Sequence, residues 1–286
     1  MAFDKERFFM TDARPDSASH YDRWTDAWRH MLGDDFHVGY FAHPDLPLEI
    51  ATKRMTRLLA ENAALQPGMN VLDVGCGTGS PALHLAQEHN CRVLGISTSE
   101  VCVERATALA ARANMSHQVR FEVRDGVDTG LDAGSFDCVW AMESSHLMPR
   151  KDLLLTECSR VLRPGGRLVL CDFMLLRQMR FQEVPAVRKE ILVLDKVFGK
   201  AVVWELPEYV RSAKEAGFRV LSELDITRET LPTFDRWRAN SYTRASVFVE
   251  LLGSEALEQF RAACDIFSRS WLDRLGYGVL VAERAS

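Results

Sequence analysis

No pair of cysteines in the sequence has the C-x-x-C spacing, although the chain contains seven cysteines. Their odd number and dispersed positions argue against a disulfide framework or a zinc knuckle. Most of them stand in apolar runs, where a free thiol behaves as a small buried hydrophobic group. The histidines other than His146 have no partners at the spacing of metal ligands, so we expect no metal site.

A long apolar run and an excess of positive charge are also missing. No stretch of about 18 uncharged apolar residues is present, and four of the first seven residues are charged where a signal peptide would be apolar. Lys and Arg total 35 against 40 Asp and Glu, and this net charge of −5 has the wrong sign for holding a phosphate backbone. We therefore expect a cytoplasmic protein with no membrane span and no nucleic-acid partner.

What the sequence does contain is enough apolar residues for a large core. Of its 286 residues, 47% are hydrophobic, which excludes disorder. Residues 1–15 have no periodicity and are expected to form a flexible tail. In residues 17–32 aromatic and apolar residues recur at three- and four-residue steps, which predicts an amphipathic helix with one aromatic side. With a second helix expected at 48–62, residues 16–64 are predicted to form a helical lid.

The middle of the chain alternates short apolar runs with helical stretches. This alternation predicts buried parallel strands joined by helices. We expect an α/β fold, a doubly wound Rossmann-like sheet of seven strands that is mostly parallel, with one late antiparallel strand and a helical cap. The expected strands are 71–74, 92–96, 119–123, 136–141, 167–173, 218–226 and 277–283. Residues 65–286 would form the core, with a cap insertion at about 178–206 over one edge of the sheet.

A glycine-rich turn follows the first of these strands. In the segment VLDVGCGTGSP, glycines let the backbone bend sharply beside a ligand, and the helix that begins next offers free N–H groups. Three glycines, Gly75, Gly77 and Gly79, alternate with other residues, and Asp73 precedes the first of them by two positions. A dinucleotide-binding turn would instead have the spacing Gly-x-Gly-x-x-Gly.

This turn resembles that of class I S-adenosylmethionine-dependent methyltransferases, whose motif of acid-x-Gly-x-Gly-x-Gly it matches throughout. The resemblance implies that S-adenosyl-L-methionine is the cofactor, with the glycines beneath its methionine part and Asp73 at its amino end. Many members carry an acid at the end of the second strand for the ribose hydroxyls. Ser97 and Thr98 occupy that place here and are the candidates for this role.

Two further matches extend the resemblance from the strand at 71–74 to a turn at 160–166, just before the fifth strand. At the end of the third strand, Asp125 is the candidate for contacting the adenine amino group, although an Asp before a glycine turn is also common on protein surfaces. The cofactor-binding candidates are Asp73, Gly75, Gly77, Gly79, Ser97, Thr98, Asp125, Gly126, Val127 and Glu143.

Directly after the fourth strand, the chain places Glu143 and His146 at the edge of the sheet where ligands bind in α/β folds. Imidazole titrates near neutral pH, so His146 is a candidate base beside the transferred methyl group. The alternative is a histidine that only shapes the pocket. This stretch, together with Asp172 after the fifth strand, resembles small-molecule methyltransferases of the rebeccamycin-type sugar O-methylating group.

The helix at 17–32 and the loop after it resemble the segment ahead of the core in sterol and geranyl diphosphate C-methyltransferases. The matching residues are Tyr21-Asp22, Thr25-Asp26 and Asp35-Phe36-His37. Ordinary packing of an amphipathic helix would explain the aromatic residues equally well. Otherwise they line an acceptor pocket and stabilise positive charge. The catalytic candidates are His146, Glu143 and Tyr21, and the pocket candidates are Tyr21, Trp24, Tyr40, Phe41, Asp172, Phe181, Trp204 and Trp237.

We therefore expect methyl transfer from S-adenosyl-L-methionine to a hydrophobic small-molecule acceptor in specialised metabolism. Carbon methylation of an isoprenoid alkene through a carbocation is placed ahead of O- or N-methylation with His146 as base. A nicotinamide-dependent oxidoreductase and a non-catalytic cofactor-binding module are the alternatives from other classes. An aromatic helix side could also pack on a neighbouring subunit, so a homo-oligomer is expected.

Overall fold

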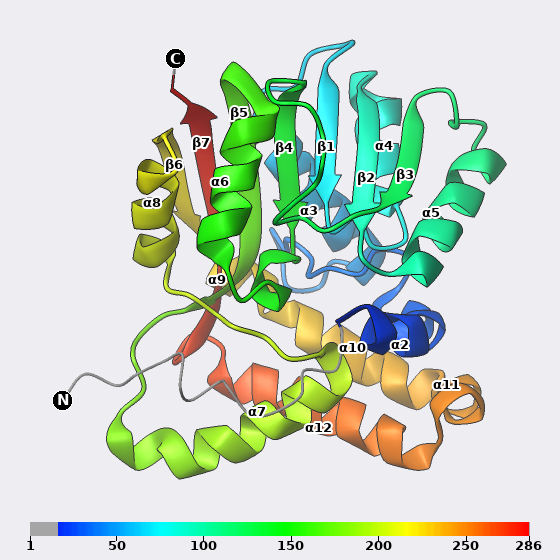
Figure 1. The fold of residues 1–286 in the computed structure, drawn as a ribbon. Coiled ribbons are helices and arrows are strands. Elements are labelled where there is room, and N and C mark those ends of the chain that lie inside the picture. The colour runs from blue at the N-terminus through cyan, green and yellow to red at the C-terminus, as the bar shows by residue number, and fades with distance from the viewer. Residues whose placement is uncertain (1–16, 286) are drawn as a thin grey trace.

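A central sheet of seven strands organises the protein, for which a computed structural model describes residues 17–285 (Figure 1). The strand order is β3-β2-β1-β4-β5-β7-β6. The strands are β1 (Asn70–Val74), β2 (Arg92–Ser97), β3 (Val119–Val123), β4 (Phe136–Met142), β5 (Leu162–Leu175), β6 (Phe218–Asp225) and β7 (Leu275–Arg284). The predicted tail at 1–15 lies outside the described residues.

Strands β1 to β5 pair in parallel, whereas β7 is antiparallel to both of its neighbours, β5 and β6. The predicted Rossmann-like sheet with one late antiparallel strand is therefore confirmed. Its middle strands are buried along most of their length because helices cover both faces. In β1, for example, all residues from Val71 to Val74 are buried.

Successive residues of a strand point to opposite faces, and each face has its own core. Leu72, Val139 and Leu168 pack with α6 (Lys151–Val161) and α8 (Leu206–Glu215) on one face. On the other face Val71 and Val169 pack in a second cluster with residues of α3 (Leu48–Ala63) and α4 (Ser80–His89). Helix α5 (Glu100–Arg112) contacts β2 and β3, and all seven cysteines are buried and free.

A layer of helices lies across the carboxyl ends of the parallel strands, at the bottom of Figure 1. It consists of α2 (Ser17–Leu32), α7 (Val184–Phe198), α10 (Pro232–Thr243), α11 (Ala245–Leu252) and α12 (Ser254–Ser270), which contact one another. The cap insertion, expected over one edge of the sheet, supplies α7 of this layer at the carboxyl-end edge. The contribution of α10 to α12 to the cap was not predicted.

Aromatic rings hold this cap layer together and explain its position. Phe198, at the end of α7, stacks on Trp28 of α2 with ring centroids 6.1 Å apart. It also lies 5.9 Å from Trp237 of α10 and 5.4 Å from Phe267 of α12. Helix α7 ends there because Gly199 has a φ of +85°, so the helical period expected up to residue 204 stops at 198.

The aromatic side of α2 is buried inside the chain, with Trp24 3% and Trp28 2% exposed. It is therefore not a free surface for a neighbouring subunit, and that reason for expecting an oligomer is lost. Short elements complete the fold: α9 (Thr227–Thr230), η1 (Ser145–Leu147) and η2 (Phe181–Glu183). No helix among residues 17–285 is long and apolar enough to cross a membrane.

Candidate active site

A large cleft opens at the carboxyl ends of β1, β2 and β4, under the first half of α2. The glycine turn after β1 forms its floor. Gly77 has a φ of +51° and nothing lies within 4 Å of where a Cβ would be, so its backbone faces open space. Gly75, with a φ of +80°, allows the turn to pass close to Ser144. A Cβ added at position 75 would lie only 2.2 Å from the Cβ of Ser144.

Gly79 has a different role from the one expected. It does not line the cleft, and an added Cβ would meet Phe121 at 2.7 Å and Ala106 at 2.8 Å. Gly79 is the residue that precedes the first turn of α4, and its φ is +87°. We conclude that Gly79 allows close packing of the turn against α5 and β3 and does not form part of the ligand-binding surface.

Asp73, at the end of β1, is the buried acid of this cleft. The residue is 2% exposed, and its Oδ2 has no hydrogen-bond partner among the residues that the structure describes. Burial raises the pKa of Asp73 to about 7. An isolated buried carboxylate is costly unless a cation or donor pairs with it. The amino group of S-adenosyl-L-methionine is such a partner, so this residue fits the cofactor.

The remaining cofactor candidates surround the same cleft. Ser97, Thr98, Asp125, Gly126, Val127 and Glu143 all line it. The Oγ of Ser97 accepts a hydrogen bond of 3.1 Å from the backbone N–H of Ser99, and Asp125 Oδ1 accepts one of 3.0 Å from that of Val127. Both contacts fix the side chains at the strand ends, where they are available to ribose and adenine.

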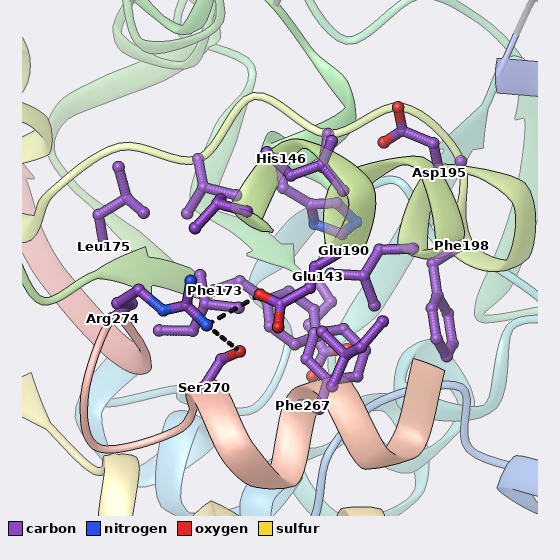
Figure 2. A pocket seen from close by; sticks show the side chains of 18 of the residues that line it. Glu143, His146, Phe173, Leu175, Glu190, Asp195, Phe198, Phe267, Ser270 and Arg274 are labelled. Atoms are coloured by element: carbon purple, nitrogen blue, oxygen red, sulfur yellow. Dashed lines mark hydrogen bonds and ion pairs between the residues drawn. The ribbon is translucent and has the colours of Figure 1, made fainter. Parts of the chain in front are cut away.

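A second, narrower cavity adjoins the cleft and lies between the sheet and the cap helices α7 and α12 (Figure 2). Its volume is about 140 Å³, against about 1730 Å³ for the cleft. Most of its lining is apolar or aromatic, which suits a hydrophobic acceptor. Tyr21, Phe36 and Glu143 line both spaces, so the two meet at these residues.

Glu143 adopts a left-handed backbone conformation with a φ of +48°, which is uncommon for a residue other than glycine and is typical of functional sites. Its Oε1 accepts hydrogen bonds of 2.8 Å from the backbone N–H of Val38 and from the hydroxyl of Tyr277 on β7. Burial raises the pKa of Glu143 to about 8, although these two hydrogen bonds oppose the shift. The side chain is therefore mainly protonated at neutral pH.

His146 is held by a buried carboxylate. Its Nδ1 lies 2.7 Å from Asp172 Oδ1, and its backbone N–H donates to Asp172 Oδ2 at 2.8 Å. Burial alone would raise the pKa of Asp172, but the charge of His146 and hydrogen bonds from His146 and Ser145 keep it below its ordinary value. Asp172 was expected in the substrate pocket; it lies behind His146 and lines neither space.

Three residues around this pair were missed from the sequence. The Oγ of Ser145 donates to Asp172 Oδ2 at 2.5 Å and lies 2.7 Å from the hydroxyl of Tyr209 on α8. Lys151, which is fully buried, donates from Nζ to the Met148 carbonyl at 3.0 Å, and burial lowers its pKa to about 8. Ser145 could have been identified from the sequence because it directly precedes His146. Nothing in the sequence around Tyr209 indicates that this residue lies near the site.

The predicted aromatic pocket residues fall into two groups. Tyr21 lines both spaces, Trp24 and Trp204 line the cleft, and Trp237 lines the cavity. The others line neither, which corrects their assignment: Tyr40, Phe41 and Phe181. The loop of Tyr40 and Phe41 is tied by backbone hydrogen bonds to α3 and α9, and Phe181 is 87% exposed on the surface.

Comparison with known proteins agrees with this geometry. Residues 71–166 match the family described as a methyltransferase domain. The chain is 37% identical over 243 residues to a 27-O-demethylrifamycin SV methyltransferase of Amycolatopsis mediterranei, covering 85% of each chain. It is 31% identical over 271 residues to an O-methyltransferase of Aspergillus sclerotiorum, covering 94% of this chain and 97% of that one.

A solved structure of a geranyl diphosphate methyltransferase in complex with geranyl diphosphate and sinefungin shares the fold, with a TM-score of 0.71 and 21% identity. The match covers 94% of this chain and 98% of that chain. The predicted resemblance to such enzymes is confirmed at the level of fold. Because relatives matched over nearly their full length are methyltransferases, and because the cleft under α2 suits their cofactor, this chain belongs to the class I S-adenosyl-L-methionine-dependent methyltransferases.

Proposed function

We propose that this methyltransferase acts on an oxygen atom of a hydrophobic small-molecule natural product, with His146 as general base. The contact of 2.7 Å between His146 Nδ1 and Asp172 Oδ1 carries the proposal. It favours the tautomer with the proton on Nδ1 and turns the lone pair of Nε2 away from Asp172. The names of both relatives, which refer to O-methylation, support oxygen over the carbon acceptor that the sequence favoured.

Positioning is the first task of the site. When bound, the cofactor supplies an electrophilic methyl group on a sulfonium. Asp73 would hold its amino end, Asp125 its adenine, and Ser97 and Thr98 its ribose hydroxyls. The junction of cleft and cavity at Tyr21 and Glu143 would be where acceptor and methyl group are aligned, and the closed cap would keep water out.

Proton removal is the second task. An acceptor hydroxyl beside His146 passes its proton to Nε2 during or after attack on the methyl carbon. The imidazolium that forms is stabilised by Asp172, which is kept ionised by its hydrogen bonds from the His146 backbone, Ser145 and the imidazole itself. Ser145 and Tyr209 then act as positioning residues, because Ser145 contacts Asp172, Tyr209 contacts Ser145, and neither lines the cavity.

Residues 16–64 form the proposed lid, over a core of residues 65–286 that carries the cap insertion at about 178–206. The support is that α2 roofs the cleft and that α7 forms a wall of the cavity. Ser99 at the start of α5 donates a hydrogen bond of 2.5 Å to Asp22 of α2, and Arg105 of α5 donates one of 3.0 Å to Asp26. These contacts hold α2 against the core.

Carbon methylation of an alkene is the second candidate. Attack by an alkene needs no prior deprotonation and leaves a carbocation, which aromatic faces and a carboxylate stabilise. Glu143 and Tyr21 line the place where the cavity meets the cleft, which favours this candidate. Glu143 is mainly protonated in the free protein, and a cation developing beside it would favour its ionised form. His146 would then be a late base or a pocket residue.

The deciding experiment uses S-adenosyl-L-methionine with an isotopically labelled methyl group. The protein is incubated with a set of hydroxyl and amine acceptors and a set of alkenes, and the label is located by mass spectrometry. We expect label on oxygen, and we expect His146→Ala to lower kcat by about 10²-fold to 10⁴-fold with unchanged affinity for S-adenosylhomocysteine. His117→Ala, at an exposed position, is the matched control.

Label on carbon would replace the proposal by the second candidate. A wild-type rate of oxygen methylation in His146→Ala would leave the acceptor class intact but remove His146 as the base. A homo-oligomer also stays a prediction, now without the aromatic side of α2 as its contact surface. Light scattering of the purified chain measures it.

A further inference from the structure

A small polar cluster lies at one end of the otherwise apolar cavity. It consists of Glu190 on α7, Ser270 at the end of α12, and Arg274, which precedes β7. Arg274 Nη2 donates hydrogen bonds of 2.8 Å to Glu190 Oε2 and 3.1 Å to Ser270 Oγ, as Figure 2 shows. All three residues line the cavity, and neither the sequence motifs nor the proposed chemistry assigns them a role.

The pairing of β5 with β7 gives the separation between this cluster and the proposed base. Asp172, which holds His146, pairs with Gly278, whereas Leu176 N donates to Arg274 O at 2.9 Å. Four residue steps, from Asp172 in β5 to Leu176 just after it, therefore separate the two sites, and an extended chain advances by about 3.3 Å per residue. The two sites are thus roughly 13 Å apart along the backbone, and both face the same cavity.

The charges around the cluster cancel. Arg274 pairs with Glu190 and lies 3.6 Å from Asp273, whereas Arg177 pairs with Asp273 and with Glu183. Arg269 approaches Glu190 at 3.9 Å. Three guanidinium groups thus stand against three carboxylates. An anionic ligand group would meet repulsion from Glu190 close to the attraction of Arg274, so this end of the cavity favours an uncharged group.

Hydrogen-bond donors remain available there. Ser270 is 2% exposed, and its hydroxyl oxygen accepts from Arg274, but among residues 17–285 its own hydrogen has no acceptor. Arg274 uses Nη2 for Glu190 and Ser270, and its Nη1 likewise has no acceptor within that part of the chain. A buried donor without a partner is costly, and this argument applies to the Ser270 hydroxyl. The Arg274 side chain is 16% exposed and lines the cavity, where Nη1 is free to donate to an oxygen atom of a ligand.

We propose that Ser270 and Arg274 form a second recognition site, which binds an uncharged carbonyl or hydroxyl oxygen at the end of the acceptor remote from the methylated atom. The inference rests on the proposed function in placing the acceptor in this cavity. It narrows the acceptor class to molecules with a reactive group, an apolar body and a distal neutral oxygen. Glu190 orients Arg274 and thereby acts as a positioning residue.

A binding test separates this site from catalysis. Protein saturated with S-adenosylhomocysteine is titrated by calorimetry with decanol, with α,ω-decanediol, and with ω-hydroxydecanoate, whose extended chains are of similar length. We expect the diol to bind about tenfold more tightly than decanol, since one hydrogen bond to a charged donor is gained, and to bind more tightly than the carboxylate. No turnover is needed, so an error in the proposed oxygen methylation leaves this result readable.

Ser270→Ala and Arg274→Met are expected to reduce the preference for the diol over decanol to less than about threefold. Affinity for decanol reports whether the cavity is intact in each variant. Ser254→Ala, on the exposed start of the same helix, and Arg238→Met, in a surface ion pair with Asp265, are the matched controls. Equal affinity for decanol and diol in the wild type, or an undiminished preference in both variants, would overturn the proposal. Tightest binding of the carboxylate would overturn the assignment to a neutral group.

Discussion

The buried side chain of Asp73 is expected to couple cofactor binding to the release of a proton. With its Oδ2 unpaired and its pKa raised to about 7 by burial, much of this carboxyl is protonated at neutral pH in the free protein. An ammonium group placed beside it favours the ionised form and lowers the pKa again. If the amino group of the cofactor binds beside Asp73, as proposed, binding displaces a proton from this carboxyl.

We predict that affinity for S-adenosylhomocysteine rises with pH up to about 7 and then levels, with proton release on binding below that value. Calorimetry in two buffers of different ionisation enthalpy measures the released protons. In Asp73→Asn the affinity is expected to fall about 10-fold to 100-fold and the proton release from this site to vanish. The same proton release in the variant would show that another group titrates.

Local signals explain which site residues were open to prediction. Asp73, Gly75 and Gly77 stand within five residues of one another, so their arrangement follows from a strand and a turn. The link between His146 and Asp172 spans 26 residues and requires β4 and β5 to be neighbours. Both residues were singled out in the sequence, and Asp172 lies within β5, three residues before its end. Their direct contact, and the place of Asp172 behind the histidine, depended on side-chain packing.

Among the elements, α2 shows most clearly that the bounds of a helix can be predicted when its packing partners cannot. Its bounds, residues 17–32, were predicted as observed because its apolar period is regular. Its cap neighbours α10 to α12 were not, because aromatic contacts such as Trp28 with Phe198 join segments far apart in the chain. Ser270 and Arg274 were missed for the same reason, since Glu190 meets Arg274 across 84 residues.

Helix α2 roofs the cofactor cleft with Ala18, Ser19, His20, Tyr21, Arg23 and Trp24. If it acts as a lid, a bound cofactor is expected to slow hydrogen exchange of its backbone amides, because opening then requires release of the ligand. Exchange followed by mass spectrometry, with and without S-adenosylhomocysteine, tests this. Peptides from α8, which lines neither space, are the internal control. If the ligand slows exchange equally in α2 and α8, α2 does not open as a lid and is a fixed wall of the cleft.

At the scale of the whole molecule, three of the acids that line the two spaces, Asp73, Glu143 and Asp195, carry raised pKa values. Burial raises the pKa of Asp195 on α7 to about 6, and the pKa values of Asp73 and Glu143 reach about 7 and 8. Between pH 6 and 8 the folded protein therefore keeps protons that the unfolded chain has already released. Stability must fall as pH rises through this window.

We predict that the free energy of unfolding, measured with urea, decreases from about pH 6.5 to about pH 8, by up to about 1.4 kcal/mol per pH unit for each proton retained. Below this window His20 and His84, whose pKa values burial lowers, act in the opposite sense, and Lys151 does so above it. Saturation with S-adenosylhomocysteine is expected to flatten the slope, because Asp73 is then ionised in the folded state too. An increase in stability across the window would contradict the three assignments.

The antiparallel strand β7 comes last in the chain yet lies between β5 and β6. During translation, β5 and β6 leave the ribosome with their facing edges unpaired and wait for residues 275–284 before the sheet can close. The same strand brings Tyr277, which holds Glu143. A premature stop codon before residue 275 would thus leave two unpaired strand edges that are prone to aggregation, and an active site without Tyr277. Folding of the sheet and completion of the active site therefore both wait for synthesis of β7.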